Sequence, residues 1–427
     1  MWVRNSFFLH DMMQNAVSAV KKGLLHMFSA NMLNQFLGFG SLLIVTKILQ
    51  PSEVGALKII QSYVAVCLTF ATFGFPSAII KFCAEIKDKR LCKYILKRSV
   101  TISVFVSILI CVGVWGLNAK GNLSDDFFVI KWLPWYIWLI IPNSAYILCL
   151  TYMQAIKDFK RMAGLQSVLK CISVFAVIIA TYFAGIGGYV VAVVFMMFIS
   201  MAVVFKQSDI SLDFGVKLEI PSGFWFLTKV SIFSSVLGTL CLYVDMFFLD
   251  YFIVDRDMIG YYAMSTMFIM AGTQFVGTVQ NFLTPYFAEK SSDKISLWEM
   301  MLKYQSFLSL AMLIICPFIY MIAYLLIEFY YGWQYGTVLM FLSIMLVQLW
   351  LHTAYAIVGC TLLSINKVQC NVIVATFFLL IKIILSYWFI TKYGMIGFAF
   401  AQALAEIPAI ILEYMIAKRE LKNNSFK

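Results

Sequence analysis

Apolar stretches of about twenty residues alternate with short polar segments along most of the chain. An apolar run of this length is what an α-helix needs to cross a lipid bilayer. Twelve such stretches can be distinguished, near 24–46, 60–80, 99–117, 132–154, 164–184, 187–205, 229–249, 259–283, 304–327, 337–362, 370–390 and 397–416. The boundary between the fifth and sixth stretches depends on the "GIGG" turn at Gly185 to Gly188. The pattern predicts an all-α polytopic membrane protein with about twelve transmembrane helices.

Two polar segments that interrupt this pattern resemble each other. "KILQPSEVGALKII" (Lys47 to Ile60) and "FIVDRDMIGYYAMS" (Phe252 to Ser265) each follow the first apolar stretch of a set of six. Gly55 aligns with Gly260 at an offset of 205 residues. An even number of helices per half predicts two six-helix bundles with the same orientation, related by a parallel repeat and separated by a central cleft.

The repeat divides the chain into five parts. We expect a cytoplasmic N-terminal segment, a six-helix bundle, a cytoplasmic linker, a second six-helix bundle and a cytoplasmic tail, at 1–23, 24–205, 206–228, 229–416 and 417–427. The N-terminal segment lacks the compact apolar core and small-residue cleavage site of a signal peptide.

Composition and charge agree with this topology. The chain has 427 residues, of which 62% are hydrophobic and 12% charged, against about 25% charged in soluble domains. Of the 32 Lys and Arg residues, 24 fall in the termini and the loops on their side, and 6 in the opposite loops. The positive-inside rule therefore predicts cytoplasmic termini. The net charge of +11 reflects this topology and attraction to anionic lipids, so no nucleic-acid partner is expected.

The sequence offers no motif for soluble chemistry. The ten Cys residues form no CxxC pair, and the three His residues have no metal-ligand spacing. The longest outer loop, Asn118 to Lys131, is too short to form a domain. We therefore expect no enzyme activity, no cofactor and no metal, and place the function within the helical bundle.

Polar residues at membrane depth are the candidates for that function. Several follow helical spacing and so share one face: Asn31, Asn34 and Gln35; Gln166, Lys170 and Ser173; Gln348, His352 and Tyr355; Asn371, Lys382 and Ser386. Such groups also serve as hydrogen-bonding contacts between helices. Asp245 and Glu413 lie near predicted helix ends, within reach of water. Lys170, Lys382 and Glu406 lie near mid-membrane, where a charge costs roughly 2.5–3.5 kcal/mol, which favours a water-filled cavity or a buried ion pair.

Several motifs together resemble a known family. They are Pro-x-Glu-x-Gly at Pro51 to Gly55, "FGFPSAIIKF" at Phe73 to Phe82, Val244-Asp245, "IGYYAMS" at Ile259 to Ser265, and "YGMIGFAFAQALAE" at Tyr393 to Glu406. In order and spacing they resemble the polysaccharide-unit flippases (the O-antigen, or Wzx, type) of the multidrug/oligosaccharidyl-lipid/polysaccharide exporter superfamily. The resemblance covers nearly the whole chain from about residue 20.

This resemblance implies a function and a substrate. A flippase of this type moves an undecaprenyl-diphosphate-linked oligosaccharide from the cytoplasmic to the outer leaflet of the bacterial inner membrane by alternating access. Lys170 and Lys382 are then expected to offset the diphosphate charge, and Asp245 or Glu406 to couple an ion. The groups expected to hydrogen-bond sugars are Asn31, Asn34, Gln35, Gln348 and His352. Membrane lipids are further expected partners, with a polysaccharide polymerase and a chain-length regulator as candidates.

Three alternatives remain. A cation-coupled multidrug exporter shares the superfamily fold but suits a cavity dominated by acids, whereas two lysines are central here. A polysaccharide polymerase or ligase typically has a large outer loop. The peptidoglycan-precursor flippase usually has two further helices.

Overall fold

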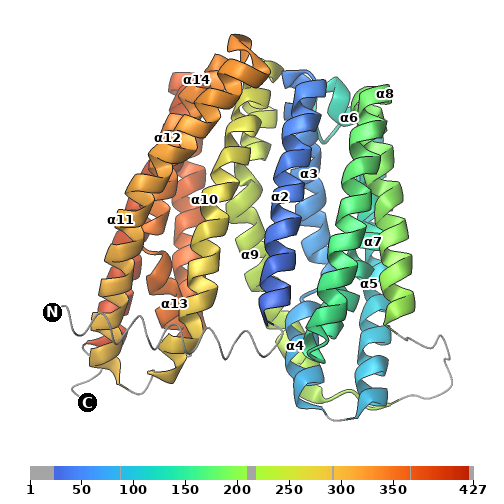
Figure 1. Cartoon of the computed structure of the whole chain (residues 1–427), viewed down its shortest axis with the longest axis vertical. Coiled ribbons are helices and arrows are strands. Elements are labelled where there is room, and N and C mark those ends of the chain that lie inside the picture. Colours follow the sequence, from blue (N-terminus) through green and yellow to red (C-terminus); the bar gives the residue numbers. More distant parts are fainter. Residues whose placement is uncertain (1–23, 87, 209–217, 291–292, 366, 423–427) are drawn as a thin grey trace. The chain divides into compact units, whose positions relative to one another are not determined.

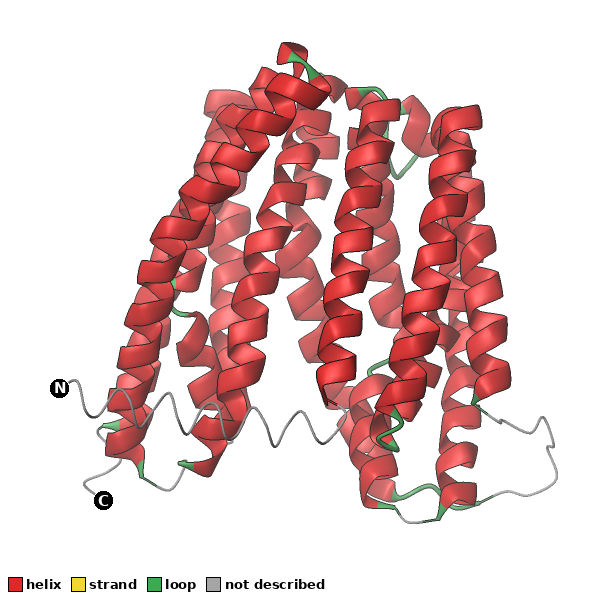
Figure 2. Cartoon of the chain, viewed as in Figure 1, coloured by secondary structure: helices red, strands yellow, loops and turns green. Residues whose placement is uncertain are grey.

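The computed structural model describes residues 24–422, apart from 87, 209–217, 291–292 and 366. Over these residues the chain forms helices joined by short loops and contains no strand (Figure 2). The predicted all-α class is confirmed for this part of the chain. The predicted segment 1–23 lies outside it, as do parts of the linker and the tail.

The helices follow the apolar pattern of the sequence (Figure 1). Their bounds in the first part of the chain are α2 Leu24–Ile48, α3 Pro51–Thr72, α4 Phe75–Glu85, α5 Lys89–Ala119, α6 Phe127–Tyr136, the 3₁₀ turn η1 Ile137–Leu139, α7 Ile140–Ala155 and α8 Phe159–Gln207. The second part contains α9 Ser222–Phe252, α10 Arg256–Glu289, α11 Lys294–Leu326, the π-helical turn η2 Ile327–Tyr331, the 3₁₀ turn η3 Trp333–Tyr335, α12 Gly336–Thr353, α13 Ala356–Ser364 and α14 Val368–Leu421.

Eight helical stretches among the described residues are long and apolar enough to cross a membrane. They are Pro51–Thr72, Lys89–Ala119, Phe127–Ala155, Phe159–Gln207, Ser222–Phe252, Lys294–Tyr331, Trp333–Ser364 and Gln369–Leu421. The protein is therefore a multi-pass membrane protein. Twelve crossings, as the sequence suggests, remain a prediction.

Two of these stretches contain a reversal of the chain. Helix α8 is interrupted at Gly185 (φ 57°, ψ −142°) and α14 at Gly394 (φ 61°, ψ −146°). Eight residues of continuous helix span about 12 Å. A Cβ atom placed on Gly188 would nevertheless overlap the carbonyl of Ala180, and one on Gly397 would lie 2.8 Å from the Phe389 carbonyl oxygen. The chain therefore folds back at both glycines, and the turn predicted at Gly185 to Gly188 is present.

The chain divides into two compact units. Among the described residues, unit 1 comprises those within 24–49, 67–123 and 131–235, and unit 2 those within 50–66, 124–130 and 236–422. Unit 2 thus includes two short segments from the first half of the sequence. Three helices, α3, α6 and α9, continue from one unit into the other.

In unit 1 a buried core forms where α4, α5 and α7 meet the start of α9. Phe224 of α9 stacks on Phe75 of α4, with ring centroids 6.1 Å apart. Gly74, just before α4, has φ 70°, and a Cβ there would lie 2.5 Å from the Thr228 carbonyl oxygen. Only glycine fits this close approach without strain. The apolar stretch expected at 60–80 is therefore broken at Phe73 and Gly74 into α3 and α4.

In unit 2, α10 and α14 both pack against α12. Tyr262, on α10, lies at the centre, with ring centroids 6.0 Å from Phe341 of α12 and 5.9 Å from Phe398 of α14. All three side chains are almost fully buried. This core holds α12 and α14, which carry most of the polar residues singled out in the second half of the sequence.

Candidate functional site

A polar cavity of about 350 Å³ lies in unit 1, lined by residues of α2, α7 and α8. Its lining residues are Asn34, Gln35, Tyr146, Gln166 and Lys170. Helical spacing predicted that Asn34 and Gln35 share one face of their helix, and Gln166 and Lys170 another. The structure brings these two faces together because α2 packs along α8. Asn31 belongs to the same predicted face of α2, but its side chain lies outside the described residues.

Lys170 supplies the positive charge of this cavity. Its side chain is exposed, and no carboxylate among the described residues forms an ion pair with it. Gly38 of α2 leaves room beside it, since a Cβ at Gly38 would lie 3.7 Å from the Lys170 ammonium nitrogen. The side-chain oxygen of Asn34 is buried without a hydrogen-bond partner. The cavity thus offers a cation and an acceptor that the protein itself leaves unused.

Tyr146 lines the same cavity but was not singled out from the sequence. It lies on α7, where a tyrosine near the middle of an apolar helix resembles an ordinary packing residue. Only the packing of α7 against α8 reveals its place.

Lys382 has a different environment, in unit 2. It is 4% exposed, and its ammonium donates a 2.8 Å hydrogen bond to the Cys241 carbonyl oxygen and lies 3.8 Å from Asp245 Oδ1. Tyr262 donates a 3.4 Å hydrogen bond to the other oxygen of Asp245. Two residues expected to have separate roles therefore form one ion pair, in which Lys382 is buried and Asp245 is largely buried.

Lys58 adds a further charge near Asp245. Lys58 is one of the six Lys and Arg residues expected in the outer loops, but it lies in α3, two turns from the start of that helix. It lies close enough to Asp245 for the two charges to attract each other. A lysine so close to a polar segment gives no signal in the sequence that it belongs to the helix.

A third cluster surrounds the buried carboxylate of Glu406 on α14. Tyr355 donates a 2.7 Å hydrogen bond to Oε2, the His352 Nδ1 atom lies 3.4 Å from the same oxygen, and Gln348 Nε2 lies 3.5 Å from Oε1. The predicted polar face Gln348, His352 and Tyr355 is therefore directed at one carboxylate. Nearly half of the His352 side chain is exposed, so the cluster is open on that side.

This cluster lies at a break in a helix. The stretch expected over 337–362 lies within the candidate membrane-spanning stretch Trp333–Ser364, but it is not one continuous helix, because α12 ends at Thr353 and α13 begins at Ala356. A break in a membrane helix frees backbone groups that need new partners. Here Gln305 bonds the Thr353 carbonyl and the Ile357 amide, Gln280 the Ala356 carbonyl, and Tyr414 the Ala354 carbonyl. The break is therefore a fixed feature of the fold.

Other polar residues of unit 2 contact neighbouring groups of the protein. Gln402 donates a 2.8 Å hydrogen bond to the Ser386 hydroxyl, and Asn371 a 3.0 Å bond to the Gly359 carbonyl. Glu413 is 4% exposed, and one of its oxygens would lie 3.1 Å from a Cβ placed on Gly359. Ser386 and Asn371 were expected to share a face with Lys382; each has a hydrogen-bond partner within the protein, although the side-chain oxygen of Asn371 is buried without one.

Comparison with solved structures gives the class of this fold. The lipid II flippase MurJ, in an inward closed conformation, superposes with a TM-score of 0.74 at 16% identity, over 92% of this chain and 87% of MurJ. An inward-facing multidrug resistance MATE family transporter of the MOP superfamily superposes with a TM-score of 0.73 at 14% identity, over 93% of this chain and 98% of the transporter. The chain therefore has the fold of these membrane transporters.

Sequence comparison gives the family. Residues 20–291 match the family described as polysaccharide biosynthesis protein. The capsular polysaccharide biosynthesis protein CapF of Staphylococcus aureus is 23% identical over 423 residues, which cover 93% of this chain and 99% of CapF. The chain belongs to the polysaccharide biosynthesis protein family, and the predicted resemblance is confirmed.

Proposed function

We propose that the protein is a flippase that moves an undecaprenyl-diphosphate-linked oligosaccharide from the cytoplasmic to the outer leaflet, for a surface polysaccharide of the capsule or O-antigen type. The observation that carries this proposal is the cavity of unit 1, in which Lys170 has no acidic partner among the described residues. Family membership and the similarity to CapF support the pathway. The transporter fold supports movement across the membrane.

The chemistry of the cavity suits both parts of the substrate head. Each sugar hydroxyl taken into hydrocarbon without a partner costs roughly 4–8 kcal/mol, so the head group needs a polar path. The side chains of Asn34, Gln35 and Gln166 offer amide donors and acceptors beside one ammonium. Amides pair with hydroxyls, and the ammonium pairs with the diphosphate or an acidic sugar. The isoprenoid chain stays in the lipid.

We assign the second unit a supporting part. Lys382 is a second substrate cation only when Asp245 releases it, since the two form a buried ion pair. Gln348 and His352 reach sugars from the exposed side of the Glu406 cluster. Asp245 and Glu406 are the candidates for ion coupling, because each holds a carboxylate beside a protonatable or cationic partner. Lys170 therefore has the leading role in substrate binding.

We infer twelve crossings in two six-helix bundles of parallel orientation, with both termini in the cytoplasm of the bacterial inner membrane. The equivalent reversals at Gly185 and Gly394 support the repeat, since their backbone angles agree within a few degrees. Helices α8 and α14, of 49 and 54 residues, are each long enough for two crossings. The expected parts 24–205 and 229–416 then correspond to the two bundles.

A cation-coupled multidrug exporter is the second candidate. The buried carboxylates Glu406 and Glu413 of unit 2 favour it, since a cationic drug needs a negative partner. A drug exporter gains nothing from Lys170, a cation that has no acidic partner among the residues that the structure describes. The two functions therefore differ in their need for Lys170.

The test is genetic. The gene is deleted in its native host, and surface polysaccharide is measured after complementation with the wild type, Lys170→Ala or Lys160→Ala. Lys160 is an exposed lysine on the same helix that does not line the cavity, so it controls for charge. We expect loss of polysaccharide with Lys170→Ala at normal protein level. Unchanged polysaccharide in the deletion strain, with increased drug sensitivity, contradicts the flippase.

A further inference from the structure

Unit 2 contains two segments whose helices continue along the chain into unit 1. Residues 50–66 form most of α3, and residues 124–130 lead into α6. Each segment enters from unit 1 and returns to it. Both segments pack near the turn that joins α9 to α10. Segment 50–66 does so mainly through backbone contacts, and segment 124–130 through polar side chains.

Segment 50–66 is held mainly by close backbone packing. A Cβ on Gly55 would lie 2.8 Å from the Gly260 amide nitrogen, so α3 and α10 cross in contact. Further along α3, the Tyr63 ring lies 4.9 Å from that of Phe247, and its hydroxyl lies 3.5 Å from Asp250 Oδ2. Such contacts are short-range, and separating the helices by a small distance removes them.

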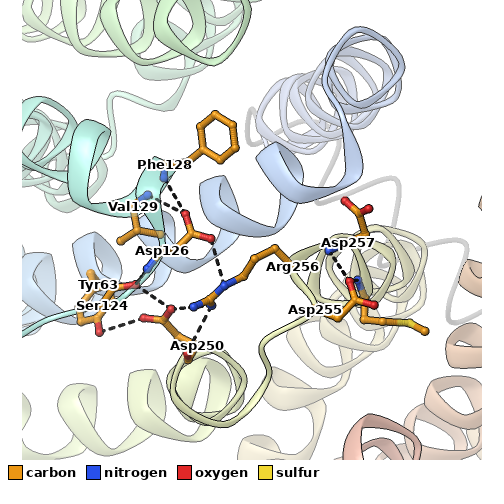
Figure 3. A network of polar contacts seen from close by, with 10 residues as sticks. Tyr63, Ser124, Asp126, Phe128, Val129, Asp250, Asp255, Arg256 and Asp257 are labelled. Atoms are coloured by element: carbon orange, nitrogen blue, oxygen red, sulfur yellow. Dashed lines mark hydrogen bonds and ion pairs between the residues drawn. The ribbon is translucent and has the colours of Figure 1, made fainter.

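Segment 124–130 is held by polar groups (Figure 3). Ser124 donates a 2.8 Å hydrogen bond to Asp250 Oδ1. Asp126 accepts from the amides of Phe128 and Val129 through Oδ1, which fixes the start of α6 and leaves Oδ2 directed at Arg256. The distance from Arg256 Nε to that oxygen is 3.3 Å.

Arg256 joins these groups into one network. Besides Asp126 it contacts Asp250, with Nη1 3.1 Å from Oδ1 and 3.3 Å from the backbone carbonyl. One guanidinium therefore serves two carboxylates that are only 3% and 6% exposed. Without Arg256 the two carboxylates repel each other in a site where both are almost fully buried and water screens them little. The neighbouring Asp255 takes no part, since it accepts from the amides of Asp257 and Met258.

We propose that Arg256, with Asp126 and Asp250, is a latch that holds segments 50–66 and 124–130 on the rest of unit 2 and opens during transport. The proposal rests on the proposed function, because alternating access requires one side to open in turn. The expected topology places the α9–α10 turn outside, so the latch closes the outer side. An ion pair suits a reversible contact: the Arg256 side chain is 22% exposed, and water can replace its partners as the segments separate.

The test measures opening without substrate. Ile59, one helical turn beyond Gly55 and 1% exposed, is replaced by cysteine in the full chain, which is then purified into lipid nanodiscs. The rate at which a water-soluble maleimide labels position 59 is read by peptide mass spectrometry. In this background Arg256→Gln is expected to raise the labelling rate about tenfold or more, the effect of losing a charged hydrogen bond.

Two further variants separate the latch from a simple loss of structure. Asp126→Asn keeps the amide-accepting oxygen but removes one charge, and we expect a smaller rise. Arg256→Gln combined with Asp126→Asn relieves the excess negative charge, so labelling should fall below that of Arg256→Gln alone. Asp257→Asn, an exposed acid in the first turn of α10, is the matched control and should leave labelling unchanged.

Labelling of Arg256→Gln and Asp126→Asn at the rate of the parent protein overturns the latch. Equal rises in Arg256→Gln and in the double variant also overturn it, since they indicate general loosening. Neither result depends on substrate or on sidedness, because nanodiscs expose both faces. Failure of the proposed flippase function would instead appear as normal surface polysaccharide in the deletion strain.

Discussion

Gly55 and Gly260 lie against each other where α3 crosses α10. A Cβ on Gly55 would lie 2.8 Å from the Gly260 amide nitrogen, and one on Gly260 would overlap the Pro51 carbonyl. The sequence paired these two residues as equivalent positions of a repeat. The structure shows in addition that they are in contact, so a side chain on either pushes the same two backbones apart.

We predict that Gly55→Val and Gly260→Val both destabilise the protein, by about 1–3 kcal/mol for an overpacked contact. The neighbouring atoms belong to the backbone, so no side chain can move to make room. The measurement is the melting temperature in detergent together with surface polysaccharide. Gly277→Ala is the control, because a Cβ there meets nothing within 4 Å. Full tolerance of Gly55→Val would contradict the contact.

A second prediction concerns the ion pair of Lys382 with Asp245. Breaking a buried pair by removing one partner costs about 3–5 kcal/mol, so Lys382→Ala should lower both the melting temperature and export. Lys382→Arg should retain more activity, and Lys382→Glu should be the most harmful. In Lys382→Ala with Asp245→Ala the stranded charge is gone, so the melting temperature should recover.

Export separates the two possible roles of Lys382. If Lys382 also binds substrate, the double variant stays defective in export although it is stable again. Normal export in Lys382→Ala with Asp245→Ala would reject Lys382 as a substrate contact. Lys382→Ala with Glu406→Ala is the comparison, and we expect no recovery there, because Glu406 bonds Tyr355 and contacts His352 and Gln348 instead.

A third prediction tests the two chain reversals. Gly185 and Gly394 have φ near +60° with ψ near −145°, a region that only glycine occupies readily. Gly185→Ala and Gly394→Ala should therefore each cost about 1–3 kcal/mol, seen as a lower melting temperature. Gly164→Ala, also on α8 but with open space around its Cβ position, should be neutral. A large effect at one turn and none at the other would argue against equivalent halves.

The fourth prediction concerns topology. Reporter fusions should place the segment 81–98 and both termini in the cytoplasm and the segment 118–131 outside, as the distribution of Lys and Arg requires. The same experiment tests the sidedness of the latch. A C-terminus on the outer side would contradict both the count of twelve crossings and the parallel repeat.

Features governed by local spacing could be predicted from the sequence. Residues three or four apart on a helix share a face, so the convergence of Gln348, His352 and Tyr355 was foreseeable. Glycine also marked the turn at Gly185 to Gly188. The break after Phe73 has a comparable signal in Gly74 and Pro76. The break at Ala354 and Tyr355 has no such signal in the sequence, because it depends on hydrogen bonds from side chains of three other helices.

Partnerships between distant residues could not be predicted. Lys170 and Lys382 both lie in apolar helices with polar neighbours, so the sequence does not distinguish them. In the structure Lys382 forms an ion pair with Asp245, whereas Lys170 lines a cavity. Arg256 and Asp126 likewise lie in ordinary polar turns, and only the fold brings them within 3.3 Å. Tertiary packing, and not local spacing, therefore decides which of these charged side chains have a charged partner among the described residues.

The central claim is that Lys170 binds the anionic head of a lipid-linked oligosaccharide. The most direct measurement is translocation of undecaprenyl-diphosphate-linked oligosaccharide from the host in proteoliposomes, comparing the wild type with Lys170→Gln and Lys160→Gln. Losing a charged hydrogen bond worth about 1.5–3 kcal/mol predicts a rate about ten- to a hundredfold lower for Lys170→Gln, and no change for Lys160→Gln. Equal rates for Lys170→Gln and the wild type would contradict the claim.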